Sequence, residues 1–406
     1  MSARRIVTLP PLVQGAQALA WTARARAAGA EAVELRSDLH LDPNLEALAA
    51  LLPLVVSERG HPPPPEWLAA AKEVDRPVEA ALREGTTIVS LHATAPMSPS
   101  DAAIRWPALP PRVWVKHVEP LGGMTEGGRL LETQARLRQR FGDRVTVLAT
   151  GEAALPFRCL LAERNALDYL ALDETWSAAA GQRLLEDAVR ASRAPPGAVR
   201  RAIIGNHIPH SRSPRVHPPP FDRLDLPPRT PLGPLLETLG SFYGGFAVTS
   251  PFKRAAAEAL GLETQAVNTL FRREGRWEGL NTDVDGAARV LSALGPGPVT
   301  LLGDGGAAVA LKEAAGREGR ELAVVRRADL PDQPVSGRAV WTWPAQVDPP
   351  AGLRFANARV AVITYGRPAR RISDLIRERG GEPLRLGAAW FVAQVRGQRR
   401  AWGLSA

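Results

Sequence analysis

Residues 244–286 carry the pair of groups with the clearest chemical potential in the chain, a lysine and an aspartate that each follow a turn. These are Lys253 and Asp283, with Asn268 and Asn281 between them. A carboxylate beside an ammonium keeps it charged, and such a dyad passes a proton to or from a hydroxyl group. An alternative role for Asp283 is the N-cap of a helix, because the Val-Asp-Gly-Ala-Ala that follows suits a first helical turn. The two roles are compatible.

Lysine is rare in this chain, since only four of the 51 Lys and Arg residues are lysine. Arginine keeps its proton in water, whereas a desolvated lysine titrates near neutrality, so each retained lysine is a candidate for amine chemistry. Lys72 and Lys312 lie in helical sequence rich in alanine and glutamate, and we interpret them as surface charges. Lys116 and Lys253 do not lie in such helical sequence, which indicates that they belong to two separate active centres.

The length and the cysteine content bound the class of protein. A chain of 406 residues predicts two or three domains, each with its own core. A single cysteine, Cys159, excludes an internal disulfide and fits a reducing compartment. No apolar run is long enough for a signal peptide or a membrane span, so the sequence predicts a cytoplasmic protein with no membrane partner.

The net charge of +9 raises the question of a nucleic-acid partner. Arginines are spread along the chain and interleaved with acidic residues instead of forming one patch with aromatic residues, so we predict no such partner. The charge is explained either by an arginine-rich coding bias or by attraction of anionic substrates. The sequence predicts no metal site and leaves the oligomeric state open.

The N-terminal half alternates short apolar strands with helical stretches such as residues 16–28. Candidate strands are residues 5–9, 32–36, 52–56, 87–90, 113–116, 145–149 and 168–171. Repeated βα units imply a parallel sheet, and this number of units predicts an α/β fold that begins with a (β/α)8 TIM barrel. The segment 194–199, which contains Pro-Pro-Gly, is the predicted linker to the second half.

Charged residues interrupt the apolar pattern where these strands end, and the strand ends of a barrel converge on one mouth. They are Glu34, Arg36, Arg59, His92 and Lys116. A lysine at that mouth attacks a ketone to form an imine, which acidifies the adjacent carbon, and a histidine then moves the proton. Arg36, Arg59 and Arg158 suit a carboxylate clamp. The alternatives are a structural histidine and a lysine whose stem packs on apolar surface.

Five segments of this half resemble type I 3-dehydroquinate dehydratases, in the family's order over residues 6–189. They are VELRSD, LVVSER, IVSLH, VWVKHV and SAAAGQ. The resemblance implies a barrel in which Lys116 forms the imine and His92 is the acid and base. The substrate contacts that it implies are Glu34, Arg36, Arg59, Arg158 and Gln182.

The second half contains a glycine turn between a strand and a helix. Strands are expected at residues 202–204, 245–249, 299–302, 322–325 and 360–364, and helices at 232–239, 254–260 and 389–400. GDGGAA follows strand 299–302 and opens a helix that runs through Ala315, where glycines let backbone amides approach a pyrophosphate. Arg326 and Arg327 follow strand 322–325 and favour a 2′-phosphate, hence NADP.

Two serines of the same half flank an arginine in the sequence SRSP. Ser211 and Ser213 suit hydrogen bonds to a substrate carboxylate. The alternative is an ordinary Ser-Pro turn.

Six segments between residues 201 and 403 resemble shikimate dehydrogenases. They are IIGNHIPHSRSPRVH, FAVTSPFK, AVNTL, GLNTDVDG, LGDGGAA and FVAQVRGQRRAWG. Residues 328–353, in contrast, do not show the family's usual strand. The resemblance implies Lys253 and Asp283 as the catalytic pair. Its implied substrate contacts are Ser211, Ser213, Thr249, Asn268, Tyr365 and Gln394, and its implied cofactor contacts are Gly303, Gly305, Gly306, Ala307, Arg326 and Arg327.

The two resemblances predict a barrel over residues 1–193, a substrate-binding domain over 200–292, a Rossmann-like NADP-binding domain over 297–385 and a returning C-terminal helix over 386–406. They imply a bifunctional enzyme that dehydrates 3-dehydroquinate to 3-dehydroshikimate and then reduces that product to shikimate with NADPH. These small molecules are its expected partners. Two alternatives remain: only one half is catalytically active, or the chain is a regulatory protein that binds a sugar acid without turnover. Binding alone would tolerate arginine, so the retained lysines favour catalysis.

Overall fold

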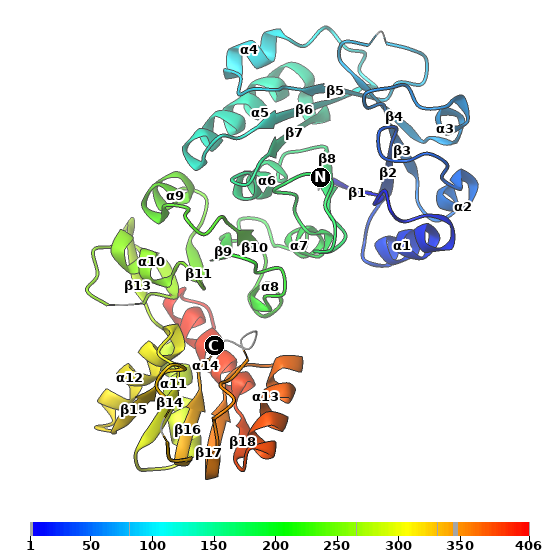
Figure 1. Ribbon diagram of the computed structural model, residues 1–406. Helices are drawn as coiled ribbons and strands as arrows, with labels where there is room; N and C mark the ends of the chain where they lie inside the picture. Colours follow the sequence, from blue (N-terminus) through cyan, green and yellow to red (C-terminus); the bar gives the residue numbers. More distant parts are fainter. Residues whose placement is uncertain (1–2, 81, 265, 331, 344–347, 406) are drawn as a thin grey trace. The chain divides into compact units, whose positions relative to one another are not determined.

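The chain folds into two units in the computed structural model, which describes residues 3–80, 82–264, 266–330, 332–343 and 348–405 (Figure 1). The first unit comprises Met1–Pro214 and Pro218–Tyr243, and the second comprises Arg215–His217 and Gly244–Ala406. No helix within these described ranges combines the length and the apolar character that crossing a membrane requires.

An eight-stranded parallel sheet forms the centre of the first unit, with the strand order β7-β6-β5-β4-β3-β2-β1-β8. Its strands are β1 (Arg4–Thr8), β2 (Ala32–Arg36), β3 (Leu54–Ser57), β4 (Glu73–Pro77), β5 (Ile88–His92), β6 (Trp114–Pro120), β7 (Val145–Thr150) and β8 (Leu167–Leu170). The order follows the chain from β1 to β7 and returns β8 to the side of β1, as in a (β/α)8 barrel.

Side chains from both edges of this sheet meet in one apolar cluster, so the sheet curls round on itself. The cluster joins Ile6 of β1, Val118 of β6, Leu148 of β7 and Tyr169 of β8, all of them buried. Successive strand residues point to opposite faces, so this cluster fills the inside of the curl while the intervening residues face outward. The predicted barrel is confirmed.

Helices cover the outward face of the barrel sheet. They are α1 (Gly15–Ala27), α2 (Leu45–Ala49), α3 (Pro65–Ala70), α4 (Pro99–Ile104), α5 (Gly127–Phe141), α6 (Leu155–Leu161) and α7 (Leu185–Ala191), with 3-10 turns η1 (Met124–Glu126) and η2 (Gly142–Arg144). Leu35 of β2 belongs to a buried cluster with Leu48 of α2 and Trp67 of α3. This outer apolar layer attaches the helices to the sheet.

Two strands of the barrel differ from the expectation. The sequence shows no strand at β4, because EVDRP has one large apolar residue and ends in proline. The expectation that Lys116 ends its strand is wrong, because β6 continues to Pro120. His117 and Glu119 give this continuation a polar sequence, but both are buried, and His117 Nε2 lies 2.9 Å from Glu119 Oε2.

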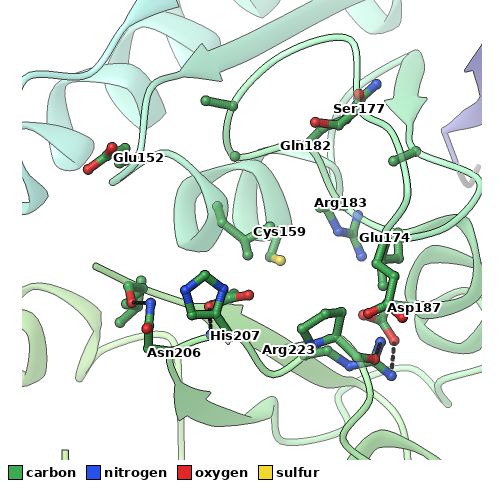
Figure 2. Close-up of a pocket in the computed structure, with 18 of the residues that line it drawn as sticks. Glu152, Cys159, Glu174, Ser177, Gln182, Arg183, Asp187, Asn206, His207 and Arg223 are labelled. Carbon is green, nitrogen blue, oxygen red and sulfur yellow. Dashed lines mark hydrogen bonds and ion pairs between the residues drawn. The ribbon is translucent and has the colours of Figure 1, made fainter. Parts of the chain in front are cut away.

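The first unit also includes segments that follow the predicted linker. β9 (Arg201–Gly205) pairs in parallel with β10 (Phe221–Asp225), β10 contacts α6 and α7 of the barrel, and α9 (Leu232–Leu239) contacts η1. The short helix α8 (Ser213–Val216) spans the point in the chain where the units change. A cavity of about 570 Å³ lies among the barrel loops, α7, β10 and the loop after β9 (Figure 2).

The second unit contains an antiparallel and a parallel group of strands. β11 (Gly245–Val248), β12 (Thr269–Arg273) and β13 (Arg276–Leu280) are antiparallel neighbours. The parallel sheet has the order β15-β14-β16-β17-β18. Its strands are β14 (Val299–Leu302), β15 (Leu322–Val325), β16 (Val335–Trp341), β17 (Phe355–Val362) and β18 (Glu382–Arg385). The helices are α10 (Lys253–Ala259), α11 (Asp283–Leu294), α12 (Gly306–Arg317), α13 (Arg367–Glu378) and α14 (Gly387–Ala401).

Helices pack on both faces of the parallel sheet. On one face Leu301 of β14 packs with Leu291 of α11 and Leu311 of α12. On the other, Val360 of β17 packs with Ile372 of α13. This arrangement is that of a Rossmann-like doubly wound domain, so the predicted fold class is confirmed for the second half as well.

The strand β16 lies in the region for which the sequence shows none, so that expectation is wrong. Its sequence VSGRAVW lacks alternation, Gly337 adopts φ +70°, and the pairing with β17 is irregular around Ser336. The strand brings Thr342 to the glycine turn, where Thr342 Oγ1 donates to the carbonyl oxygens of Leu302 at 2.8 Å and Gly303 at 3.1 Å.

A glycine at the start of α14 provides a test of this packing. A Cβ atom on Gly387 would lie 2.1 Å from the carbonyl oxygen of Thr364, and backbone cannot move as a side chain can. We expect Gly387→Ala to cost about 2 kcal/mol or more and to lower the melting temperature of the second unit by several degrees, measured by calorimetry. The matched control is Gly316→Ala in α12, where an added Cβ meets nothing within 4 Å and helix propensity improves. Equal melting temperatures for the two variants would contradict the close approach.

Candidate active sites

The mouth of the barrel contains a cavity of about 160 Å³. All seven side chains predicted for the barrel site line it, although they come from β2, β5, β6, α6 and two loops. They are Glu34, Arg36, Arg59, His92, Lys116, Arg158 and Gln182. The fold therefore brings together in one place residues that are spread over about 150 positions of sequence.

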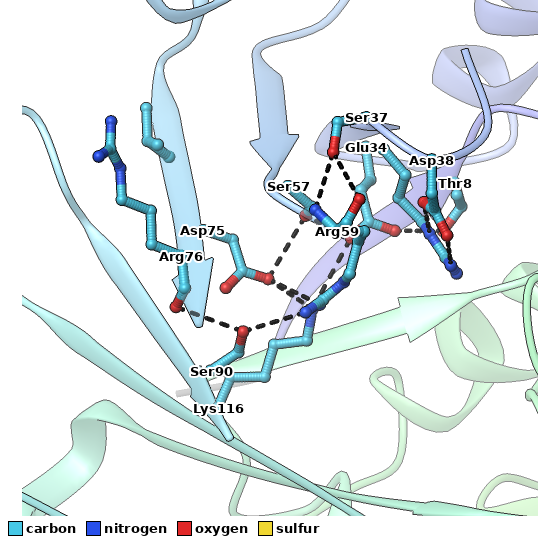
Figure 3. Close-up of polar contacts among 12 residues, drawn as sticks. Thr8, Glu34, Ser37, Asp38, Ser57, Arg59, Asp75, Arg76, Ser90 and Lys116 are labelled. Carbon is cyan, nitrogen blue, oxygen red and sulfur yellow. Dashed lines mark hydrogen bonds and ion pairs between the residues drawn. The ribbon is translucent and has the colours of Figure 1, made fainter. Parts of the chain in front are cut away.

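Lys116 lies at the bottom of this group and is 3% exposed. Its Nζ donates to Asp75 Oδ2 at 2.8 Å and lies 3.7 Å from Glu34 Oε1 (Figure 3). It also lies 3.8 Å from the ring centroid of Tyr169. Burial lowers the pKa of Lys116 below its ordinary value, even though both carboxylates oppose that shift. A lysine held in this way reaches the neutral amine form at a lower pH, and the neutral amine is the nucleophile.

Asp75 is the functional candidate that sequence reasoning missed. Its Oδ2 also accepts from Arg59 Nη2 at 3.1 Å, so one carboxylate oxygen joins the lysine to the arginine (Figure 3). Burial acts to raise the pKa of Asp75, but Lys116 and Arg59 outweigh it and hold the pKa at about 2. The contacts of ionised Asp75 therefore stabilise the fold, and this stabilisation is fully present above the ordinary aspartate pKa. It is lost as the pH falls through about 2, the pKa of Asp75 in the folded chain. The sequence signal that could have found Asp75 was the acidic residue next to Val74, in the stretch between two expected strands.

Glu34 is the second carboxylate beside the lysine. It accepts hydrogen bonds of 2.6 Å from the hydroxyl groups of Thr8 and Ser57 (Figure 3). Burial opposes ionisation of Glu34, but Lys116, Arg59 and these two hydroxyls hold its pKa below the ordinary value. Both hydroxyls are occupied as donors, so Glu34 is oriented by neighbouring strands before any ligand arrives.

His92 is the last residue of β5 and lies at the exposed rim of the cavity. Desolvation by the mouth, followed by the positive charges of Arg59 and Lys116, lowers the pKa of His92 below its ordinary value, although part of the ring remains in contact with solvent. A neutral imidazole can act as a base. No residue in the described part of the chain hydrogen-bonds its ring, so nothing there fixes the tautomer.

The cations of the mouth outnumber its carboxylates. Arg36 is matched by Asp38, which it contacts through Nε at 3.0 Å and Nη2 at 2.6 Å. Arg158 is 3% exposed and donates to the carbonyl oxygen of Tyr169 at 2.7 Å, but within the described ranges it forms no ion pair. Burial lowers the pKa of Arg158 to about 10, so it stays cationic at neutral pH. A buried cation without a counter-ion favours an anionic ligand.

Gln182 is held in the loop that precedes α7. Its side-chain Oε1 accepts from the backbone NH of Ala178 at 2.8 Å, which leaves the side-chain amide as a donor at the cavity. Ser177 of the same loop lines the larger cavity of the first unit and is absent from the lining of the mouth.

The contact between Asp75 and Lys116 can be measured directly, because lysine labelled with ¹³C at Cε reports only four residues. We expect the signal of Lys116, assigned with Lys116→Arg, to titrate below the ordinary lysine pKa. Asp75→Asn removes the nearest negative charge and lowers that pKa by a further one to three units or so. The matched control is Asp38→Asn, which removes a carboxylate that contacts Arg36 instead of Lys116. An unchanged titration in Asp75→Asn would contradict the assigned contact.

In the second unit, Lys253 and Asp283 form the predicted ion pair through Lys253 Nζ and Asp283 Oδ2. Lys253 is the first residue of α10 and its side chain is 22% exposed, whereas the Asp283 side chain is 4% exposed. The other oxygen of Asp283 accepts from Trp390 Nε1 at 3.4 Å. The N-cap of α11 is Thr282, so the alternative role of Asp283 as the cap is wrong.

Two asparagines of the same unit, Asn268 and Asn281, have buried amide nitrogens that find no hydrogen-bond partner among the described residues. Asn268 Oδ1 accepts from the backbone NH of Thr282 at 2.8 Å and from the hydroxyls of Thr269 and Thr282. These bonds fix the orientation of Asn268 and leave its NH2 group as a donor. An unmade hydrogen bond of this kind costs about 1–3 kcal/mol, so its presence points to a ligand.

The remaining predicted substrate contacts lie in both units. Thr249, Tyr365 and Gln394 are partly exposed in the second unit, and the ring of Tyr365 lies 5.8 Å from that of Phe391. Gln394 lies one helical turn from Phe391 on α14, so the two share a helix face. In the first unit Ser213 starts α8, and its backbone NH donates to Ser211 Oγ at 3.3 Å.

The glycine turn between β14 and α12 contains the predicted cofactor contacts Gly303, Gly305, Gly306 and Ala307. Gly303 adopts φ +124°, and a Cβ there would lie within 2.8 Å of Thr342 and Trp343. Among the described residues, an added Cβ on Gly305 or Gly306 meets no atom within 4 Å, so these residues leave space beside the amides that begin α12. This open helix N-terminus fits a pyrophosphate.

The predicted 2′-phosphate contacts are already engaged in ion pairs and hydrogen bonds. Arg326 Nη2 lies 3.3 Å from Asp304 Oδ2, Asp304 also pairs with Lys312, and Arg327 donates to the carbonyl oxygen of Asp348. Lys312 and then Arg326 hold the pKa of Asp304 below its ordinary value. The acid in the glycine turn is thus neutralised by two nearby cations, and Arg326 remains largely exposed toward solvent.

Comparisons with known proteins agree with these features. No protein-family model matches the chain. The shikimate dehydrogenase (NADP(+)) of Anaeromyxobacter sp. (strain Fw109-5) is 36% identical over 219 residues, which cover 47% of this chain and 75% of that protein. Proteins of the same name from Bordetella petrii and Thermus thermophilus are 37% and 36% identical over 27% and 32% of this chain. Here the chain spans only 45% and 56% of the relatives' length.

Two solved structures were found in the structural comparison. Shikimate 5-dehydrogenase from Thermus thermophilus, in complex with NADP(H) and shikimate, is 25% identical with a TM-score of 0.43 and covers 51% of this chain and 94% of its own. The dehydroquinate dehydratase and shikimate dehydrogenase of S. pombe AroM is 17% identical with a TM-score of 0.40 and covers 100% of this chain and 97% of its own.

The doubly wound sheet and the glycine turn between β14 and α12 place the second half in the class of Rossmann-like dinucleotide-binding domains. The identity of 36% with a relative of which the chain covers three quarters defines the family more closely. The chain belongs to the shikimate dehydrogenase family.

Proposed function

We propose that the chain is a bifunctional enzyme, which dehydrates 3-dehydroquinate in the barrel and reduces the resulting 3-dehydroshikimate to shikimate with NADPH in the second half. The observation that carries the first activity is the single cavity that gathers Lys116, His92 and five further predicted contacts. The second activity rests on family membership together with the ion pair of Lys253 and Asp283. The product of the first reaction is the substrate of the second, which links the two halves chemically.

Lys116 is the proposed nucleophile of the dehydration. Its neutral amine adds to the ketone carbon of the substrate, and loss of water gives an imine whose cationic form withdraws electrons from the neighbouring carbon. His92 removes the proton from that carbon, the electron pair moves toward the imine nitrogen, and the β-hydroxyl group leaves as water after accepting the proton from His92. Hydrolysis of the imine releases the product and restores the amine.

The substrate carboxylate is assigned to Arg158, a buried cation of the mouth that forms no ion pair with the described residues, with Arg36 and Arg59 nearby in the lining. Glu34 accepts hydrogen bonds from the substrate hydroxyls, and the side-chain amide of Gln182 donates to them. Asp75 joins this set, because its contact with Lys116 sets the charge on the amine. A carboxylate ligand would balance the excess positive charge of the mouth.

For the reduction, Lys253 donates a proton to the carbonyl oxygen of the substrate, and Asp283 holds the ammonium in place. The dinucleotide, when bound, supplies a hydride to the carbonyl carbon. Ser211 and Ser213 hold the carboxylate, while Thr249, Asn268, Tyr365 and Gln394 contact the remaining groups. The NADP pyrophosphate is assigned to Gly303, Gly305, Gly306 and Ala307, and its 2′-phosphate to Arg326 and Arg327.

The domain boundaries at residues 193–200, 292–297 and 385–386 remain predictions that accompany this assignment. We also propose a cytoplasmic location, where NADPH is available and the single thiol stays reduced. Cys159 is buried, and burial raises the pKa of its thiol, so it is inert as a nucleophile.

Complementary variants test the two-site assignment. We expect Lys116→Arg to abolish dehydration of 3-dehydroquinate and to spare reduction of 3-dehydroshikimate, because arginine keeps the charge but forms no imine. Asp283→Asn does the reverse, lowering the rate of reduction about a hundred- to ten-thousandfold. Dehydration is measured by absorbance of the enone product, and reduction by consumption of NADPH.

Chemical trapping provides the control for the imine. Borohydride added with 3-dehydroquinate should fix the substrate to the wild-type chain, and peptide mass spectrometry should locate it on Lys116 and find none in Lys116→Arg. Loss of both activities from either variant would contradict two independent sites, and an adduct on another lysine would contradict the assigned nucleophile.

Selectivity between cofactors tests the 2′-phosphate site. We expect Arg326→Gln to raise the KM for NADPH about tenfold or more and to leave that for NADH unchanged, because a charged hydrogen bond to phosphate is worth about 1.5–3 kcal/mol. Arg317→Gln at the far end of α12 is the control, since Arg317 contacts Glu313 on the same helix. Equal changes in both KM values would place Arg326 outside the phosphate contact.

A further inference from the structure

Arg223 of β10 contacts the loop that carries Ser211. The side chain of Arg223 is 5% exposed, and it donates from Nη1 to the carbonyl oxygen of Pro209 at 2.6 Å and from Nη2 to that of Ser211 at 3.3 Å. Backbone carbonyls are fixed acceptors, so two donors of one planar guanidinium determine both the position and the orientation of this part of the loop. A guanidinium used only for charge would not need this geometry.

The rest of the loop is attached to the same strand. Asp225 at the end of β10 accepts from the backbone NH groups of His207 at 2.7 Å and Ile208 at 3.3 Å. Asn206 Nδ2 donates to the carbonyl oxygen of Leu226 at 2.9 Å. The loop 206–211 is therefore attached to β10 along its length, and Arg223 bonds the end of the loop that carries Ser211.

A carboxylate of the barrel faces this arginine. Asp187 lies on α7, and its Oδ1 is 3.4 Å from Arg223 Nη2, with both side chains almost fully buried (Figure 2). Among the described residues, Asp187 Oδ1 accepts no hydrogen bond and Arg223 Nε has no hydrogen-bond partner, so the pair interacts through charge. Among the residues described, Asp187 is the carboxylate in ion-pair contact with Arg223. Removing it would leave a buried guanidinium uncompensated.

We propose that Asp187 and Arg223 are positioning residues for reduction, through which helix α7 of the barrel holds the loop of Ser211 in the geometry that binds substrate. The proposal rests on the proposed role of Ser211 in the reductase. The affinity of the reductase for 3-dehydroshikimate then depends on Asp187, a carboxylate of the barrel. Neither residue touches the mouth of the barrel, so dehydration is independent of the pair.

The pair also gives the reductase a defined pH dependence. Burial raises the pKa of Asp187 to about 6, against the opposing effect of Arg223 and Arg183 and with the support of Asp222 and Glu186. Asp187 is therefore charged above about pH 6 and becomes neutral as the pH falls through that value. The hold on Arg223 weakens in the same range, so the KM for 3-dehydroshikimate rises on the acidic side.

The test compares full-length Asp187→Asn and Arg223→Lys with the control Asp173→Asn. Asp173 lines the same cavity but pairs with Arg24, away from the loop. We expect both test variants to raise the KM for 3-dehydroshikimate about tenfold with kcat within about twofold, and to leave dehydration unchanged. Asp187→Asn should also remove the acidic rise of KM. The control should match the wild type in every measurement.

Hydrogen exchange measured by mass spectrometry separates this proposal from the proposed function. Exchange at amides of residues 206–213 should increase in both test variants and stay at the wild-type level in the control, whether or not the chain reduces 3-dehydroshikimate. If the wild-type chain lacks reductase activity but the variants show these differences in exchange, the assigned function is overturned and the anchoring of the loop is retained. Unchanged exchange in Asp187→Asn and Arg223→Lys would overturn the anchoring, and a higher exchange throughout the barrel would reduce it to general destabilisation.

Discussion

The barrel mouth depends on the cost of keeping the ammonium of Lys116 out of water. A buried charge is destabilising by several kcal/mol unless partners surround it, and the partners here must come from neighbouring strands because the lysine lies in the middle of β6. Asp75 and Glu34 provide the charge, and Ser57 orients Glu34 through a hydrogen bond of 2.6 Å. The same network holds Arg59 at the rim. One constraint therefore orders residues from β2, β3, β4 and β6, while burial lowers the pKa of the amine against the opposing effect of the two carboxylates.

The second half manages its charges differently. Lys253 and Asp283 begin two helices, α10 and α11, so each side chain projects from a helix end instead of a sheet interior. The lysine side chain is 22% exposed and contacts the carboxylate of Asp283. The unpartnered amides of Asn268 and Asn281 are the local cost of this arrangement, and a ligand that accepts hydrogen bonds would relieve it.

A buried polar network connects the two predicted enzymes within the first unit. Asp222 of β10 accepts from Arg200 of the segment before β9 and from the hydroxyl of Tyr243, the latter at 2.8 Å. Arg183 of the barrel pairs with Asp168 at 3.0 Å and lies 3.9 Å from Asp222. The first strands of the reductase sequence thus share their charge compensation with the barrel. This sharing explains why β9 and β10 belong to the barrel unit although they follow the predicted linker.

Much of this protein was determined by local sequence. Short apolar segments separated by helical stretches predicted most barrel strands, since parallel strands covered on both faces are apolar runs, and the glycine turn predicted the start of α12 because few residues other than glycine adopt φ near +124°. Lysine scarcity singled out Lys116 and Lys253. The identity of the reacting residues was therefore available from residue type and order.

Their environment was decided only by tertiary structure. Asp75 lies on a strand that has one large apolar residue and ends in proline, so its sequence did not indicate a strand, and its role exists only because β4 pairs with β3 and β5 in the curled sheet. The ion pair of Asp187 and Arg223 likewise joins a position on α7 to a position on β10, and nothing in either local sequence indicates that the two residues meet. Partners of buried charges come from neighbours in space, and strand order, which sets those neighbours, is a property of the whole fold.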